Sequence, residues 1–127
     1  MGKKVLWISI FAPLSVQEER LRNKFGHDIQ IVHHNQPIKS AEEVAGLFRE
    51  KGYDDWVVVG LSMGAIGRVC ELAEEQDFKK PLWTNMRQLP RAKSAEADLR
   101  HGARFFKFLG FRRVKRLVFE FQEGEDF

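Results

Sequence analysis

The sequence is poor in the residues that mark several large classes of protein. Its single cysteine, Cys70, excludes an internal disulfide framework and is typical of a reducing compartment, so we expect a cytoplasmic protein. We expect neither a signal peptide nor a membrane-spanning stretch, because the N-terminal apolar run 5–14 is short and contains Ser9 and Pro13. The sequence therefore predicts no contact with a membrane. Repeats and low-complexity segments are also absent from it.

The motifs of common cofactor and metal sites are missing as well. The spacing of Gly60, Gly64 and Gly67 is not that of a dinucleotide-binding fingerprint, and the Gly-Lys-Ser/Thr sequence of a P-loop is absent. His33 and His34 are adjacent, so within a strand they point to opposite faces and cannot jointly bind one ion. Paired carboxylates and the usual spacing of metal ligands are not found at the expected strand ends. We therefore expect neither a cofactor nor a metal ion.

What the sequence does contain is enough apolar material for one domain, residues 1–127. The chain of 127 residues is 43% hydrophobic and includes 11 Phe, which suffices for an ordered core. The net charge is only +3, but residues 87–116 contain ten Lys and Arg against two Asp and Glu, whereas residues 117–127 contain four acidic residues and no basic one. The local excess indicates an anionic partner, nucleic acid or nucleotide first, unless it is simply a solvated face.

Apolar runs alternate with helical patterns along residues 1–87. Capping boxes at Ser15–Glu18 and Ser40–Glu43 begin two helices, and a third helix follows Gly64. This alternation predicts an α/β fold, a Rossmann-like three-layer sandwich with a mostly parallel sheet in the order 2-1-3-4. The expected strands are residues 4–10, 29–32, 56–59 and 81–86.

The chain changes character after the fourth expected strand. Residues 88–103 form a basic connector, with a helical turn at 95–100. Residues 104–122 are expected to form a C-terminal β-hairpin, with strands 105–109 and 113–121 on either side of a turn at Gly110-Phe111.

The stretch 55–68 combines an apolar run, a glycine-rich turn and a helical pattern. A strand, a turn and a helix in this order place backbone N–H groups and the positive end of the helix around one small space, which suits an anion. Gly60 to Gly64 also matches G-x-S-x-G, the nucleophile elbow of α/β-hydrolases, although His101 is the one histidine that follows Ser62. A third interpretation is a tight turn that needs small residues for packing.

Open α/β sheets bind ligands beyond the carboxyl ends of their strands, where the strand order reverses. In the order 2-1-3-4 this point lies between the first and third strands, and three loops should meet there. The candidate ligand-binding residues are Ser9, Phe11, Pro13, Asn35, Gln36, Gly60, Leu61, Ser62, Met63 and Gly64 in these loops, and Asn85, Arg87, Arg91 and Lys93 at or after the end of the fourth strand.

These hydroxyls, amides, imidazoles and guanidinium groups suit the binding of phosphodiesters. Without a metal, one feasible reaction is attack by a ribose 2′-OH on its neighbouring phosphate. The protein then needs only to hold the hydroxyl in line and to stabilise the developing charge. The candidate catalytic residues are His33, His34 and Ser62, with a histidine as the expected proton acceptor near pH 7.

A proline-containing turn, Ala12-Pro13-Leu14-Ser15, follows the first expected strand, and Gln17, Glu18 and Glu19 lie in the helix after it. This arrangement resembles small CRISPR-associated ring-nuclease families related to the Rossmann-like CARF sensor domains, in which the turn is of the His-Pro-Leu-Thr type. The turn that contains Ser62 is similar to the phosphate-facing loop of CARF-type folds. The resemblance covers residues 4–70, and this chain has Ala12 where the family has a His.

The resemblance implies a homodimer that binds a cyclic oligoadenylate across its two-fold axis. It further implies cleavage of this ring without metal, which would switch off a CRISPR antiviral response. The symmetric repeat of phosphates in such a ring suits an isologous dimer. The C-terminal hairpin would then pair the subunits or cover the ligand.

Other functions stay open at the level of sequence. A non-catalytic module could bind nucleic acid or a nucleotide through residues 87–116. A domain that only binds a partner protein and a small hydrolase are further alternatives. Affinity for linear nucleic acid that falls steeply with salt would indicate the first of these.

Overall fold

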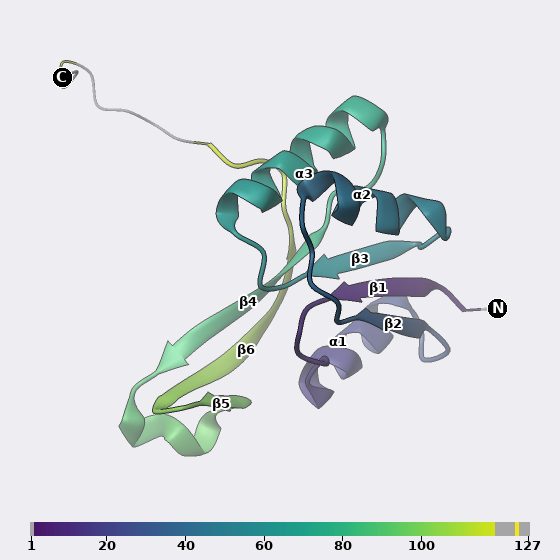
Figure 1. Ribbon diagram of the computed structural model, residues 1–127. Coiled ribbons are helices and arrows are strands. Elements are labelled where there is room, and N and C mark those ends of the chain that lie inside the picture. The colour runs from purple at the N-terminus through teal and green to yellow at the C-terminus, as the bar shows by residue number, and fades with distance from the viewer. Residues whose placement is uncertain (1, 119–123, 125–127) are drawn as a thin grey trace.

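The computed structural model describes residues 2–118 and 124 and contains one six-stranded sheet (Figure 1). Strands and helices alternate as expected up to β4, which is longer than predicted. The elements in chain order are β1 (Lys4–Ile8), α1 (Ser15–Phe25), β2 (Gln30–His34), α2 (Ala41–Glu50), β3 (Asp55–Val58), α3 (Met63–Gln76), β4 (Leu82–Leu89), η1 (Arg91–Glu96, a 3-10 helix), β5 (Leu99–His101) and β6 (Arg104–Arg113).

The strand order of the sheet is β2-β1-β3-β4-β6-β5. The predicted order 2-1-3-4 is thus found in the first four strands, which pair in parallel. Strand β6 pairs with β4 and with β5, and both pairs are antiparallel. The sheet of this α/β protein is therefore mixed, and the expectation of a mostly parallel sheet holds only for β1 to β4.

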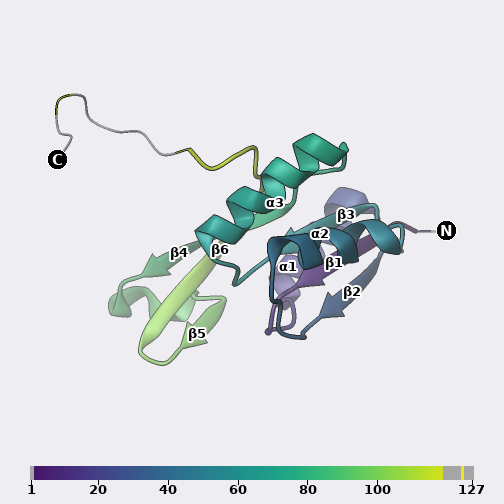
Figure 2. The same cartoon turned by 45° about the horizontal axis from the view of Figure 1, so that its top comes forward.

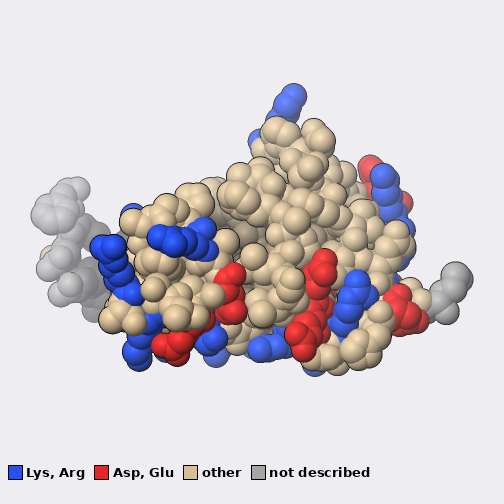
Figure 3. All heavy atoms as spheres, turned by 90° about the horizontal axis from the view of Figure 1, so that it is seen from below, with Lys and Arg blue, Asp and Glu red and all other residues tan. Residues whose placement is uncertain are grey.

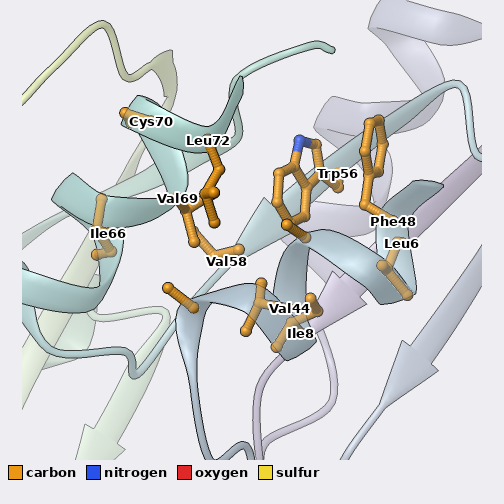
Figure 4. Close-up of a cluster of buried hydrophobic side chains, with 12 residues drawn as sticks. Leu6, Ile8, Val44, Phe48, Trp56, Val58, Ile66, Val69, Cys70 and Leu72 are labelled. Atoms are coloured by element: carbon orange, nitrogen blue, oxygen red, sulfur yellow. The ribbon is translucent and has the colours of Figure 1, made fainter. Parts of the chain in front are cut away.

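Helices cover both faces of the parallel strands. Alternate residues of β1 therefore pack into two hydrophobic cores, one on each face of the sheet. Leu6 and Ile8 pack with side chains of α2, α3 and β3 (Figure 4). Val5 and Trp7 pack on the other face against Leu21 of α1. The near-continuous apolar run of β1 follows from this burial on both sides.

Strands β4 and β6 continue beyond the parallel strands as a ribbon (Figure 1, Figure 2). We call residues 83–112, with η1 and β5 at the tip, the arm. Strand β3 pairs with β4 at Val57 and Leu82, whereas the β4–β6 ladder runs the whole length of β4. Helix α1 contacts one face of the arm, where the guanidinium of Arg20 lies 5.4 Å from the ring centroid of Phe108.

The predicted C-terminal hairpin is wrong. Gly110 and Phe111 lie within the continuous strand β6, and the register of the β4–β6 ladder shifts beside Gly110, which has φ 132°. A β-bulge thus uses the glycine that suggested a turn. Residues 114–118 do not continue as a strand, residues 119–121 lie outside the described residues, and η1 and β5 replace the helical turn at 95–100.

The first helix begins differently from the prediction. Its N-cap residue is Leu14 rather than Ser15, and the Gln17 side chain accepts a hydrogen bond from the N–H of Leu14 (2.7 Å). The expected cap of α2 is confirmed, since the Ser40 hydroxyl accepts a hydrogen bond from the N–H of Glu43 (3.1 Å).

An ion pair between a buried carboxylate and a partly exposed arginine connects the base of the arm to β3. The Asp55 carboxylate is 1% exposed and accepts hydrogen bonds from both terminal nitrogens of Arg113, at 2.6 and 2.8 Å. The Trp56 N–H donates to the same carboxylate (2.8 Å), and Lys79 Nζ lies 3.7 Å from it. The bidentate geometry connects the first residue of β3 to the last residue of β6.

We expect Arg113→Ala to lower the free energy of unfolding by about 3 kcal/mol, because it leaves a buried carboxylate with Lys79 as the remaining nearby cation. The neighbouring exposed Arg112→Ala serves as the control and should change stability by less than about 0.5 kcal/mol. Urea denaturation of both variants measures the difference. Equal losses in the two would show that the ion pair does not fasten the arm.

Candidate functional site

The loops that follow β1, β2 and β3 lie side by side, as the sequence predicts. The N–H of Ser9 donates to the carbonyl of His34 (3.2 Å), and the N–H of Val59 donates to the carbonyl of Ile8 (2.8 Å). The Ser9 side chain is buried and accepts a hydrogen bond from the N–H of Phe11 (3.1 Å). We call residues 9–13, 33–36 and 60–64 the loop cluster.

The two histidines at the end of β2 have different surroundings. His33 Nε2 lies 2.7 Å from the carbonyl oxygen of Ser9, so in the neutral ring Nε2 carries the proton and Nδ1 is the free acceptor. His34 Nε2 is buried, and no hydrogen-bond partner for it is found within the described part of the chain. A ligand in solvent can thus reach a basic nitrogen of His33 more readily than Nε2 of His34.

Ser62 is the N-cap of α3, and its hydroxyl accepts a hydrogen bond from the N–H of Ala65 (3.1 Å). The first two N–H groups of the helix, those of Met63 and Gly64, have no acceptor within the helix. The first turn contains no acidic residue, and a Cβ at Gly64 would meet open space. The cradle expected from the sequence therefore has two amide donors without a helical acceptor, on residues that are exposed.

The backbone of Ser62 does not resemble a nucleophile elbow. Its φ of −63° and ψ of 156° are ordinary extended values, whereas an elbow holds the serine in a strained turn. Among the described non-glycine residues, positive φ occurs at Asp77 alone. The geometry favours a helix cap and offers no support for the hydrolase alternative.

The loop cluster also exposes large apolar side chains. Ile10 is 71%, Phe11 60% and Met63 56% exposed. The Phe11 ring meets the ring of His101 edge to face, with centroids 6.3 Å apart. Because His101 ends β5, this contact brings the arm against the loop after β1, a proximity that the sequence did not reveal.

Gln17 joins the arm to the start of α1 and was not predicted as a site residue. Its side chain is buried, accepts from the N–H of Leu14 and donates from Nε2 to the Thr84 hydroxyl (3.0 Å). Gln17 therefore orients the Pro13-containing loop against β4. In the sequence, this role was indicated by the position of Gln17 three residues after Leu14, where a Gln can accept a hydrogen bond from the N–H of the N-cap residue.

The remaining predicted loop residues have lesser roles in this geometry. Asn35 and Gln36 are exposed, and Gln36 Nε2 donates to Asn35 Oδ1 (3.3 Å). Pro13 is half-buried, Leu61 packs against the core between α2 and α3, and Gly60 has φ 82°, which explains a glycine there.

The predicted basic residues are spread along the arm and do not gather at the loop cluster. Asn85 is half-buried and Arg87 is exposed on β4. Arg91 and Lys93 lie on η1 at the tip of the arm (Figure 1). Strand β4 alone carries the chain about 23 Å from Leu82 to Leu89, at about 3.3 Å per residue. The sequence could not show this length.

Groups of charges, metal ligands and a nucleophile are the features of the described surface and the site that bear on its chemistry. On the face seen in Figure 3, the upper middle of the surface lacks charged side chains, and both basic and acidic side chains lie below and beside it. Among the described residues, no group of three or more His, Cys, Asp or Glu could hold a metal ion. Burial raises the pKa of the Cys70 thiol, which makes it a poor nucleophile.

Comparison of the chain with family models, with curated proteins and with solved structures found no match. In the described part of the chain, none of the helices has both the length and the apolar character needed to span a bilayer.

Two glycines of the cradle should respond oppositely to substitution. We expect Gly60→Ala to cost about 1 kcal/mol of stability, because alanine disfavours a positive φ. Gly64→Ala should instead stabilise by about 0.5 kcal/mol, because Gly64 is helical and its Cβ would meet open space. Thermal unfolding of both variants tests this. A loss of stability in Gly64→Ala would contradict the described geometry of the cradle.

Proposed function

We propose that the loop cluster binds a cyclic oligoadenylate, with two copies of the chain meeting around the ligand. The observation that carries the proposal is that the loops after β1, β2 and β3 lie side by side and contain the first amides of α3, the His33 ring and an exposed Phe11. Amide donors at a helix start suit a phosphate, and an aromatic ring suits an adenine base. A cyclic oligoadenylate is the ligand implied by the resemblance of residues 4–70 to CARF-related ring nucleases.

A CARF-type, Rossmann-like fold is part of the same proposal. The parallel order β2-β1-β3-β4 supports it, as do the helices on both faces of β1 and β3. The exposed side chains of Ile10, Phe11 and Met63 support a homodimer, because burying them between two copies would remove apolar surface from water. A two-fold axis through this area would place two cradles around one ring.

Cleavage would proceed by attack of the ligand's own 2′-OH on the adjacent phosphate, which forms a P–O2′ bond, breaks the P–O5′ bond and leaves a 2′,3′-cyclic phosphate and a protonated 5′-hydroxyl. Nδ1 of His33 is the proton acceptor that the geometry favours, since Nε2 is bonded to the carbonyl of Ser9. The Ser62 hydroxyl and the amides of Met63 and Gly64 would stabilise the developing charge. His34, with Nε2 buried, has no direct role in this scheme.

Binding is tested by calorimetry with cyclic oligoadenylates of several ring sizes, and we expect one ring per two chains. Gly64→Val should abolish binding, because its side chain blocks the approach of phosphate to the backbone. Ser62→Ala should weaken binding about fivefold, the equivalent of about 1 kcal/mol. Gly46→Val on α2 is the matched control. Equal affinity of all variants for the ring would show that the ligand does not bind at the loop cluster. A monomer in sedimentation at micromolar concentration would contradict the dimer.

Cleavage is tested separately by incubating the protein with the bound ring in EDTA. We expect linear products that end in a 2′,3′-cyclic phosphate, and we expect His33→Ala to slow their formation at least about tenfold. Chromatography identifies the products. Activity that requires added metal, or products with a 5′-phosphate, would exclude this mechanism without affecting the binding proposal.

A further inference from the structure

One tryptophan differs from the other two in its surroundings. Trp7 and Trp56 are 2% and 0% exposed, and their indole N–H groups donate to the carbonyls of Phe11 (3.0 Å) and Lys79 (2.8 Å). Trp83 is 37% exposed on β4, and within the described residues its indole N–H has no acceptor. Its position is therefore not explained by packing in the core.

Trp83 lines a hollow of about 260 Å³ between the start of α3 and the base of the arm. The hollow is apolar within and basic at its rim, and no acidic residue is among the described residues that line it. Gly67 lets residue 117 approach α3 closely, since a Cβ there would lie 3.1 Å from the Cβ of Leu117. The lining residues are Met63, Ile66, Trp83, Arg112, Arg113, Val114, Arg116 and Leu117.

The arginines that line this hollow differ in whether they already form an ion pair within the chain. Arg113 forms an ion pair with Asp55. Arg112 and Arg116 are exposed and form no ion pair within residues 2–118. Arg112 is the cross-strand partner of Trp83 in the β4–β6 ladder. Positive charge therefore stands directly beside the exposed indole.

The positive charge continues along the arm on the same side of β4. Alternate residues of a strand share a face, so Trp83, Asn85 and Arg87 lie on one face. Arg87 pairs across the ladder with Lys107, whose Nζ donates to the Glu96 carbonyl (3.5 Å), and in the described chain no ion pair of either side chain is found. We call this row the arm track: Trp83, Arg87, Lys107, Arg112 and Arg116.

We infer that the arm track binds single-stranded nucleic acid, with a base stacked on Trp83 and phosphates on the arginines. An aromatic platform in a row of cations is the usual means of binding single strands without sequence preference. A duplex keeps its bases stacked on one another, so it could use the cations but not the indole. The inference goes beyond binding of a small ring at the loop cluster, and apart from Met63 at their border the two surfaces share no residue.

The full-length protein is tested with a fluorescently labelled oligothymidylate of about twelve nucleotides, a length within the usual site sizes. We expect the oligonucleotide to quench the emission of Trp83, and we expect the affinity to fall steeply with salt. Trp83→Ala should weaken binding at least about tenfold. Arg87→Ala and Arg112→Ala should each reduce the slope of log affinity against log salt by about one.

Lys51→Glu, on an exposed position after α2, is the charge-changing control and should leave the affinity unchanged. Gly64→Val should also leave it unchanged, which separates this surface from the loop cluster. Quenching of the parent protein does not depend on whether Trp83→Ala folds, and Arg112→Glu offers a second variant. Equal binding of duplex DNA, unchanged tryptophan emission, or preference for an acidic peptide over the oligonucleotide would overturn the inference.

Discussion

An ion pair between the buried carboxylate of Asp55 and Arg113 connects the base of the arm to the parallel strands. Asp55 begins β3 and is almost inaccessible to solvent, and Arg113 stabilises its charge through two hydrogen bonds, with a further one from the Trp56 N–H and with Lys79 nearby. Strand β4 lies between Asp55 and Arg113 in the sheet and pairs with β3 at one position, Val57 with Leu82. The ion pair thus adds a link between the parallel and antiparallel halves to the short β3–β4 ladder, as do the contacts of Gln17 with Thr84 and of Arg20 with Phe108.

The parallel half was predictable because its signals are local. Apolar runs buried on both faces and a Ser40 cap identify β1 to β3 and their helices from short windows of sequence. The arm was not predictable in this way. Gly110 suggested a turn but occupies a bulge within β6, and the partner of Arg113 lies 58 residues away. Contacts over such separations leave no periodic pattern in the sequence.

The candidate site, like the fold, was predictable in part. Strand ends fix which loops meet, so the loop cluster follows from the strand order. The roles of its side chains depend on backbone groups that a sequence does not display, such as the Ser9 carbonyl that holds His33. Arg91 and Lys93 follow the fourth strand closely in sequence, yet β4 extends for eight residues and carries them to the tip of the arm.

Helix α3 borders both surfaces. Its first turn provides the amides of the cradle, and Met63 and Ile66 line the hollow beside Trp83. A change that frays this helix start would disturb both surfaces at once, because the Ser62 cap holds the first turn in place. A Ser62 variant therefore reports on both surfaces, so ring binding and oligonucleotide binding are measured on it together. Gly64 and Trp83 lie on opposite sides of this border, so substitutions at these two positions report on one surface each.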